Sequence, residues 1–189
     1  MIDKLKDYRK LITENPIFKQ RTVGKGIVEI DDALNFSITG VNLRSSGVEL
    51  DFRQSDYLYS DIELNPVVLL EKDAWSRCEA RIKEIEESIR IVSQAIEKIK
   101  MNENFEQKLI NPLTIKLPEG EYYSEIEAPR GLACLYVKSD GADKPYRLKW
   151  RTGSYYSVNL LRKLLVGTYL NDAIAIAGSL DIVLPEVDK

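Results

Sequence analysis

The most restrictive feature of this sequence is a periodic stretch at residues 73–100. Its apolar side chains recur at alternating steps of three and four, at Trp75, Cys78, Ile82, Ile85, Ile89, Val92, Ile96 and Ile99. This spacing places them in one stripe along an α-helix of roughly 40 Å, at about 1.5 Å per residue. The flanking segments do not continue the repeat, which argues against a coiled coil. We therefore expect a central helix that packs against a mixed domain along this stripe.

The start of the predicted helix carries charged residues on one flank of the stripe. Asp73 stands where an N-cap or first-turn acid belongs, and Arg77 and Arg81 follow one and two helical turns later. Two interpretations remain open. The side chains form a solvated ladder, worth roughly a few tenths of a kcal/mol, or they belong to a buried ion network.

A second concentration of charge lies upstream, at residues 40–54. Glycines and serines surround Arg44, and Asp51 and Arg53 lie near the end of the segment. A loop with exposed charges has this composition. The alternative is an ordered loop whose arginines and acid pair inside an interface, and composition does not decide between the two.

Downstream of the long helix, the sequence predicts an antiparallel meander followed by short helices. Strands are predicted at residues 122–128, 132–137 and 146–151, with tight connections at 129–131 and 139–143. Short helices are predicted at 158–166 and 172–177, ahead of a tail, and residues 101–117 are predicted to form a surface loop. The result is an α+β fold with a long central helix, short helices and a small antiparallel sheet.

We expect one domain over residues 1–189. The long helix takes about 73–100, the meander about 120–151, and the C-terminal helices and tail 156–189. The net charge of −3 does not favour nucleic acid or an anionic membrane as a partner. No apolar run approaches the about 18–20 residues that a membrane-spanning helix needs.

Composition excludes several classes of catalytic site. The chain has 0 histidines, so it offers neither a histidine base nor a His-containing zinc site or Ser–His–Asp triad. Cys78 and Cys134 are far apart and form no CxxC pair, and no glycine-rich phosphate loop is present. We expect this chain to bind no metal and no cofactor of its own, and not to be an enzyme in isolation.

Several motifs in order resemble one known family. They are residues 15–22, 40–53, the helix start at 73–84, Glu-Ala-Pro-Arg-Gly at 127–131, Ser-Asp-Gly at 139–141, Pro-Tyr-Arg at 145–147 and the tail at 178–188. Together they resemble the D subunit in the peripheral arm of proton-pumping NADH:quinone oxidoreductase, respiratory complex I. The resemblance implies the C-terminal half of a protein related to the large subunit of nickel–iron hydrogenases.

The sequence departs from that family in three ways. The family's N-terminal half, with its histidine-bearing loop and its tyrosine at the quinone headgroup, has no counterpart here. Leu132 stands where the family usually has Glu, and Pro185 and Lys189 replace Gly and Arg. The related hydrogenases bind nickel through a CxxC pair in this tail, which contains no cysteine here. The sequence therefore favours the complex I side of the superfamily, or a metal-free cousin.

By resemblance, the tail lies at a quinone pocket shared with an iron–sulfur subunit. The candidates are Asp181 and Val183, with Leu184 and Glu186 near them. A carboxylate among apolar neighbours has a raised pKa and suits proton relay at a quinone. The alternative is that Asp181 caps a turn and pairs with a basic residue such as Arg147 or Arg151.

The resemblance also implies partners and a structural ion network. The network candidates are Arg44, Asp51, Arg53, Asp73, Arg77, Arg81 and Arg130. The quinone is then a substrate at the shared site, and the iron–sulfur cluster belongs to a partner subunit. The family's N-terminal half is a second expected partner. We expect a peripheral position on the cytoplasmic side of the inner (plasma) membrane, reached only through the complex. The competing hypothesis is a scaffold or assembly module of a hydrogenase-related membrane complex, without quinone chemistry.

Overall fold

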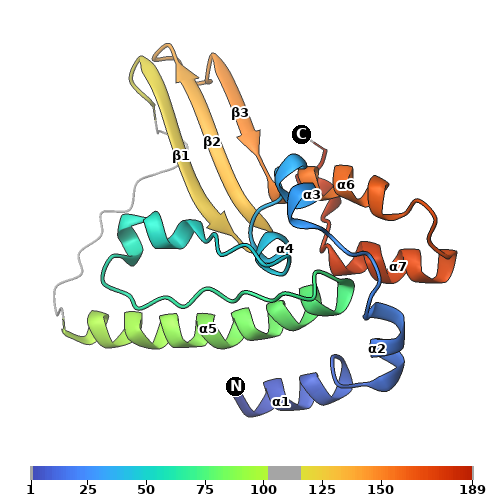
Figure 1. The fold of residues 1–189 in the computed structure, drawn as a ribbon. Coiled ribbons are helices and arrows are strands. Elements are labelled where there is room, and N and C mark those ends of the chain that lie inside the picture. The colour runs from blue at the N-terminus through green and yellow to red at the C-terminus, as the bar shows by residue number, and fades with distance from the viewer. Residues whose placement is uncertain (1, 102–115, 189) are drawn as a thin grey trace.

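The structure, a computed structural model, describes residues 2–101 and 116–188. Helices and one small antiparallel sheet confirm the predicted α+β class (Figure 1). In chain order the elements are α1 (Ile2–Leu11), α2 (Pro16–Thr22), α3 (Ile30–Asn35), α4 (Val41–Arg44), η1 (Phe52–Ser55), η2 (Tyr57–Tyr59), α5 (Ala74–Met101), β1 (Gly120–Ala128), β2 (Gly131–Ser139), β3 (Arg147–Arg151), α6 (Gly153–Leu164), α7 (Leu170–Ser179) and η4 (Leu184–Glu186). Most of the loop predicted at 101–117 lies outside the described residues.

Helix α5 is the long helix that the periodicity predicts, and it runs along one side of the molecule (Figure 1). It packs against α1, α2, α4 and α7. Its buried apolar residues, Ala74, Ala80 and Ile82, all lie in its first three turns. In the part of the chain that the structure describes, no helix is long and apolar enough to cross a membrane.

The expectation that the apolar stripe of α5 is buried along its whole length is wrong. Ile85 is 40 % exposed, and Val92 and Ile99 are each 55 % exposed. Beside this part of α5 runs an irregular segment that bonds to it through polar groups, as where the Glu63 N–H donates to Gln94 Oε1 at 3.0 Å. Periodicity specifies which side chains share a face of a helix, but not how far a partner surface extends along that face.

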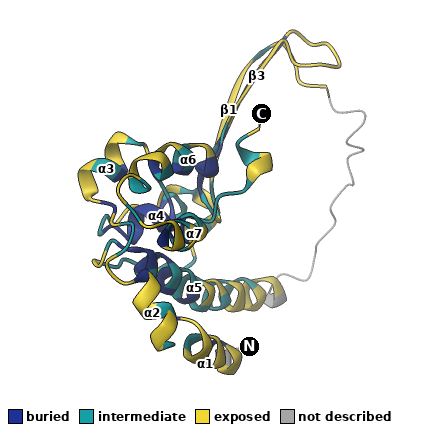
Figure 2. Ribbon diagram, turned by 90° about the vertical axis from the view of Figure 1, so that its right-hand side faces the viewer, coloured by how far each residue is buried: buried dark blue, intermediate teal, exposed yellow. Residues whose placement is uncertain are grey.

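The sheet is a meander in the order β1-β2-β3, antiparallel throughout. Its base rests on the helices, while the far end of the hairpins projects away from them (Figure 2). Burial differs between strands: on β2, Leu132 and Cys134 near the base and Val137 toward the far end are each 8 % exposed, whereas Tyr123 on β1 is 63 % exposed. The central strand β2 is therefore the covered one, and β1 and β3 are mostly exposed.

Two glycines allow the base of the sheet to approach the start of α4 closely. Gly40 and Gly131 both have positive φ, 68° and 110°. A Cβ on Gly40 would lie 2.5 Å from the Gly131 Cα. The hydroxyl of Thr39 accepts a hydrogen bond from the Leu132 N–H at 2.9 Å, across the same contact. This contact brings the end of β1 against α4, and with it the side chains of the candidate site.

The buried apolar core joins segments from both ends of the chain. Its members are Val28, Ala33, Ile38, Leu43, Leu160 and Leu180. Leu180 is 1 % exposed and directly precedes Asp181, so the core anchors the start of the tail. Burial of a leucine side chain stabilises a fold by about 1.5–3 kcal/mol, which is enough to hold this end of the tail in place.

Candidate functional site

The tail turns sharply at Asp181, just after α7. Asp181 has a positive φ of 55°, and its N–H donates to Gly178 O at 3.1 Å. Its carboxylate lies between two guanidinium groups. Arg130 Nε is 3.3 Å and Arg81 Nε is 4.0 Å from Asp181 Oδ2, and Arg130 Nε also donates to the Asp181 carbonyl at 3.1 Å.

The apolar surroundings expected for Asp181 are therefore absent from the described structure. Its side chain is 41 % exposed, and its partners are arginines from two other elements. Neither is Arg147 or Arg151, the partners considered from sequence. The residues next to Asp181 in sequence are apolar. Its left-handed backbone conformation and the position of Arg130 after β1 nevertheless place the carboxylate beside arginines.

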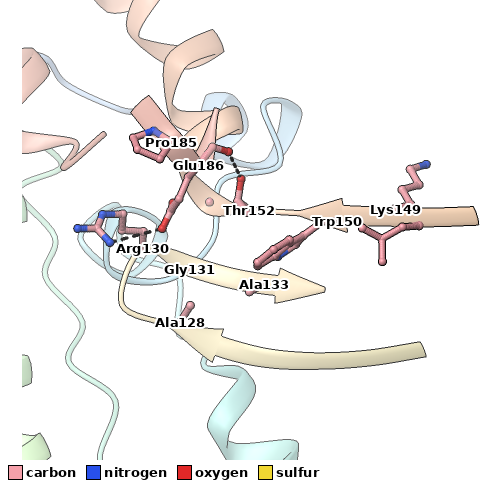
Figure 3. Close-up of a pocket in the computed structure, with 11 residues that line it drawn as sticks. Ala128, Arg130, Gly131, Ala133, Lys149, Trp150, Thr152, Pro185 and Glu186 are labelled. Carbon is pink, nitrogen blue, oxygen red and sulfur yellow. Dashed lines mark hydrogen bonds and ion pairs between the residues drawn. The ribbon is translucent and has the colours of Figure 1, made fainter. Parts of the chain in front are cut away.

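Glu186 lies one turn further on, in η4, and connects the tail to the base of the sheet. Its carboxylate accepts from Arg130 Nη1 at 3.4 Å and from the Ser154 hydroxyl at 2.5 Å. The Thr152 hydroxyl donates to the Glu186 carbonyl at 2.6 Å, and the Arg130 and Thr152 links appear in Figure 3. Val183 is half-buried and its N–H donates to Ser154 Oγ at 3.3 Å, whereas Leu184 is 75 % exposed.

A cavity of about 850 Å³ lies between this tail and the sheet (Figure 3). Ala133, Leu148 and Trp150 supply apolar surface from β2 and β3, and Pro185 and Glu186 border it from the tail. A volume of roughly 300–1,000 Å³ with mostly apolar walls and a few polar groups is typical of small-molecule sites.

A second cavity, of about 400 Å³, lies between α5, the end of β1 and the tail. Asp181 and Arg81 line one part of it, and Arg44, Arg53, Glu84 and Glu127 line another. Of the four tail candidates, Glu186 borders the first cavity and Asp181 the second. Val183 and Leu184 border neither of these two.

Arg44 is the centre of a buried ion cluster beside this second cavity. Its Nε and Nη2 donate to Glu84 Oε1 at 3.0 and 2.8 Å, and its Nη1 donates to Glu127 Oε1 at 2.8 Å. Arg53 completes the cluster by donating to both oxygens of Asp51 and to Glu84 Oε2 at 2.9 Å. The Arg44 side chain is 2 % exposed, so the segment 40–54 is ordered around it.

Sequence reasoning proposed three members of this cluster and missed two. Arg44, Asp51 and Arg53 come together, while Glu84 and Glu127 were not among the network candidates. Both acids lie in motifs that carry the family resemblance. Their position within those motifs was the available signal, but spacing along the chain does not show that a helix and a strand meet at Arg44.

The other network candidates lie in two separate groups. Arg130 binds the tail, whereas Asp73, Arg77 and Arg81 join the start of α5 to neighbouring segments. Asp73 caps α5 by accepting from the Ser76 N–H at 2.8 Å, and it also accepts from the Gly24 N–H at 2.7 Å.

Arg77 fits neither interpretation drawn from sequence, and Arg81 fits the ion network only in part, through Asp181 at 4.0 Å. Arg77 is fully buried and donates to Gly26 O, Lys72 O and Ser179 Oγ, all neutral oxygens. Burial, together with the charge of Arg81, lowers the pKa of Arg77 to about 10. Arg81 donates to Ser179 O at 2.7 Å. These arginines therefore tie the end of α7 to α5 instead of pairing chiefly with carboxylates.

Two carboxyl groups of the cluster have pKa values shifted in opposite directions. Burial raises the pKa of Asp51, but the Arg53 hydrogen bond and the charges of Arg44 and Arg53 outweigh it, so the pKa falls below its ordinary value. Burial also raises the pKa of Glu127, and here Arg44 offsets it only in part. Neutral Glu127 would leave the two arginines facing two carboxylates, which balances the buried charges.

The lowered pKa of Asp51 gives a prediction for acid unfolding. A depressed folded-state pKa stabilises the fold above the unfolded value of about 4, and this stability is lost as pH falls through the folded value. We expect the wild-type free energy of unfolding to fall more steeply between about pH 5 and pH 3 than that of Asp51→Asn. Urea unfolding across this range measures both slopes, with Asp143→Asn on the exposed hairpin as control. Equal slopes for the wild type and Asp51→Asn would contradict the assignment.

Among the described residues, no group of three His, Cys, Asp or Glu side chains could hold a metal ion. Both cysteines are free; Cys134 is buried and Cys78 half-buried. Burial raises the pKa of the Cys78 thiol, which makes it a poor nucleophile. What the arrangement offers is an apolar cavity, arginine-bound carboxylates and a second cavity beside them, lined by both charged and apolar side chains.

Comparison with known proteins gives one consistent family. The model of the family described as "Respiratory-chain NADH dehydrogenase, 49 Kd subunit" matches residues 1–189. The D subunit of the NADH-quinone oxidoreductase of Geobacillus kaustophilus is 44 % identical over 190 residues, and that of Bacillus mycoides is 40 % identical over 190 residues. Each alignment covers 100 % of this chain and 51 % of the relative, so the chain spans about half the length of these relatives.

A solved structure shares the fold. A chain in the membrane-bound sulfane sulfur reductase, described as an archaeal respiratory membrane complex, superposes with a TM-score of 0.89 at 37 % identity. The match covers 99 % of this chain and 52 % of that one.

Proposed function

This chain belongs to the family of the 49 kDa subunit of respiratory-chain NADH dehydrogenase, and from that premise we propose that it is part of the quinone-reducing module of a complex I-like NADH:quinone oxidoreductase. In this proposal its tail lines one side of the quinone pocket. An iron–sulfur subunit supplies the electrons from the opposite side. The rest of the family protein, absent from this half-length match, supplies further walls.

The observation that carries the proposal is the apolar cavity of about 850 Å³ at the tail. A quinone headgroup is a planar ring with two carbonyl oxygens, so it needs an apolar slot and a few hydrogen-bond donors. Trp150 and Leu148 offer the apolar surface, and Arg130 offers a guanidinium at the rim. Arg130 also holds Asp181 and Glu186, which keeps two carboxylates close to such a site.

The exposed apolar face of the second half of α5 supports the proposal that this chain binds another part of the complex. The second half of α5 presents Val92, Ile96 and Ile99 to solvent in one stripe, as an apolar face that another chain segment covers in an assembly. We assign this face to the remaining half of the family protein. The complex places the chain peripherally on the cytoplasmic side of the plasma membrane, with membrane contact only through other subunits and no role for nucleic acid.

The test is Asp181→Asn in the assembled complex. If Asp181 relays protons to a quinone, its neutralisation slows quinone reduction about tenfold or more, because a positioned proton donor typically contributes about 10²–10⁴-fold. Native gels measure complex content beside the quinone-reductase rate. Asp188→Asn, at an exposed position in the same tail, is the matched control and should keep the wild-type rate. Val183 borders neither of the two cavities in the described part of the chain, so its pocket role rests on the family resemblance; if that role holds, Val183→Phe should disturb quinone or inhibitor binding more than assembly.

A second candidate function is a scaffold without quinone chemistry. It is favoured by the neighbour of the same fold, which belongs to a complex described as a sulfane sulfur reductase. It is also favoured by the two arginines that hold Asp181, since such pairing suits a structural role. If Asp181→Asn keeps full activity, or only prevents assembly, the pocket role is wrong and the scaffold stands.

A further inference from the structure

The cavity of about 400 Å³ beside the ion cluster contains an unusual pair of atoms. In the described part of the chain, Arg81 Nε and Glu127 Oε2 are buried side-chain atoms without a hydrogen-bond partner. Both residues line this cavity. Buried polar groups are nearly always hydrogen-bonded, so two orphans around one cavity indicate that something polar occupies it.

The two orphans belong to residues that line the cavity, and the other polar atoms of both side chains are already bound. Arg81 donates through Nη1 to Ser179 O and through Nη2 to Asn42 Oδ1, which leaves Nε. Glu127 accepts from Arg44 Nη1 through Oε1, which leaves Oε2. The Glu127 side chain is 4 % exposed, so Oε2 is buried in the cavity wall without a partner among the described residues.

The same cavity reaches the tail carboxylate. Asp181 lines it, and Arg81 Nε lies 4.0 Å from Asp181 Oδ2. The cavity therefore has Glu127 in one wall and Asp181 in another, with Arg81 beside Asp181. A cavity of this size, lined by charged as well as apolar side chains, is roomy enough for several water molecules at its hydrogen-bonding groups.

We propose that ordered water in this cavity connects Glu127 Oε2 with the Asp181 carboxylate, and that Glu127 stores one exchangeable proton for the tail. The part concerning quinone reduction rests on the proposed function, whereas the hydrated proton site does not. The transfer moves one proton and no electrons. The O–H bond of Glu127 breaks and leaves a carboxylate, water passes the proton on, and an oxygen of Asp181 receives it.

The surrounding charges suit both states of Glu127. When Glu127 is neutral, Arg44 and Arg53 are balanced by Asp51 and Glu84. When it is ionised, the hydrogen bond from Arg44 Nη1 at 2.8 Å holds the new carboxylate. Oε1 already accepts from Arg44, so the stored proton sits on Oε2, the oxygen without a partner in the described chain.

The first test is infrared spectroscopy of the full chain near neutral pH. We expect the carbonyl stretching band of a protonated carboxylic acid in the wild type, and its loss in Glu127→Gln. Glu119→Gln, at an exposed position before β1, is the matched control and should keep the band. Absence of the band in the wild type, or its survival in Glu127→Gln, overturns the proposal.

A second variant tests the water without touching either acid. Ser88 is exposed at the rim of the cavity, so Ser88→Leu should displace water and slow hydrogen–deuterium exchange of the Glu127 band severalfold. Ser93→Leu, at an exposed position on the same helix, should leave the exchange rate unchanged. Equal exchange in the two variants overturns the water link.

Melting temperature separates a stored proton from a permanent ion pair. Glutamine mimics the neutral acid, so Glu127→Gln should melt close to the wild type near neutral pH, whereas Glu84→Gln should melt clearly lower. An equal drop in the melting temperature of both variants makes Glu127 an ionised partner of Arg44 and overturns the proposal.

In the assembled complex, Glu127→Gln should slow quinone reduction severalfold. If Asp181→Asn keeps full quinone-reductase activity while the infrared band of Glu127 is present, the proposed function is contradicted but the proton site at Glu127 is not.

Discussion

Replacement of Arg44 by leucine is expected to lower the free energy of unfolding by about 3–5 kcal/mol. The reason is the set of groups that it leaves behind. Asp51 and Glu84 would remain buried with Arg53 as their only arginine, and the Leu50 carbonyl and Glu127 Oε1 would each lose a donor. Removal of one partner from a buried ion network costs about this much, because the uncompensated charges stay out of water.

Urea unfolding of the full chain measures this loss, with Arg162→Leu as the matched control. Arg162 is exposed on α6, so the same substitution there should change the free energy of unfolding by about 0.5 kcal/mol or less. Arg44→Lys keeps the charge but not the forked geometry that reaches Glu84 and Glu127 together, so we expect an intermediate loss. A loss for Arg44→Leu no larger than for Arg162→Leu would show that the cluster does not stabilise the fold.

The local elements of this fold could be predicted from the sequence because local chemistry specifies them. The three-and-four spacing gave the long helix to within about one residue at each end, and tight turns around Pro129 and Gly141 gave the meander. What the spacing could not give was the extent of burial. Val92 and Ile99 are each 55 % exposed although they lie on the apolar stripe, because the segment beside this part of α5 bonds to it through polar groups.

The candidate site was harder to predict because its geometry comes from long-range contacts. Arg44 meets Glu127 across 83 positions of sequence, through the close approach of Gly40 and Gly131. Hydrophobic periodicity along the chain does not indicate a contact between residues so far apart in sequence. Asp181 shows the same limit, because its neighbours in sequence are apolar while its neighbours in space are arginines. Family resemblance pointed to the right segments, and the fold decided how they pair.

The second large effect is expected where the sheet meets α6. Gly153 is buried at the first residue of α6, directly against the loop that carries Arg130. A Cβ there would lie 1.9 Å from the Arg130 carbonyl oxygen and 2.7 Å from its carbonyl carbon. These are backbone atoms, so no side-chain rotation relieves the clash. We expect Gly153→Ala to lower the free energy of unfolding by about 3 kcal/mol or more, at the upper end of overpacking effects.

The same substitution at another helical glycine should act in the opposite direction. Gly178 lies in α7, and a Cβ there would meet nothing within 4 Å. Gly178→Ala should therefore stabilise the chain by about 0.5–1 kcal/mol, because alanine loses less conformational freedom in a helix. Urea unfolding of both variants gives the comparison. If Gly153→Ala folds with wild-type stability, the base of the sheet is not held against α6 as described. Arg130 would then lack the support that keeps it on Asp181 and Glu186, and the larger cavity, which Arg130 and Gly153 both line, would lose that wall.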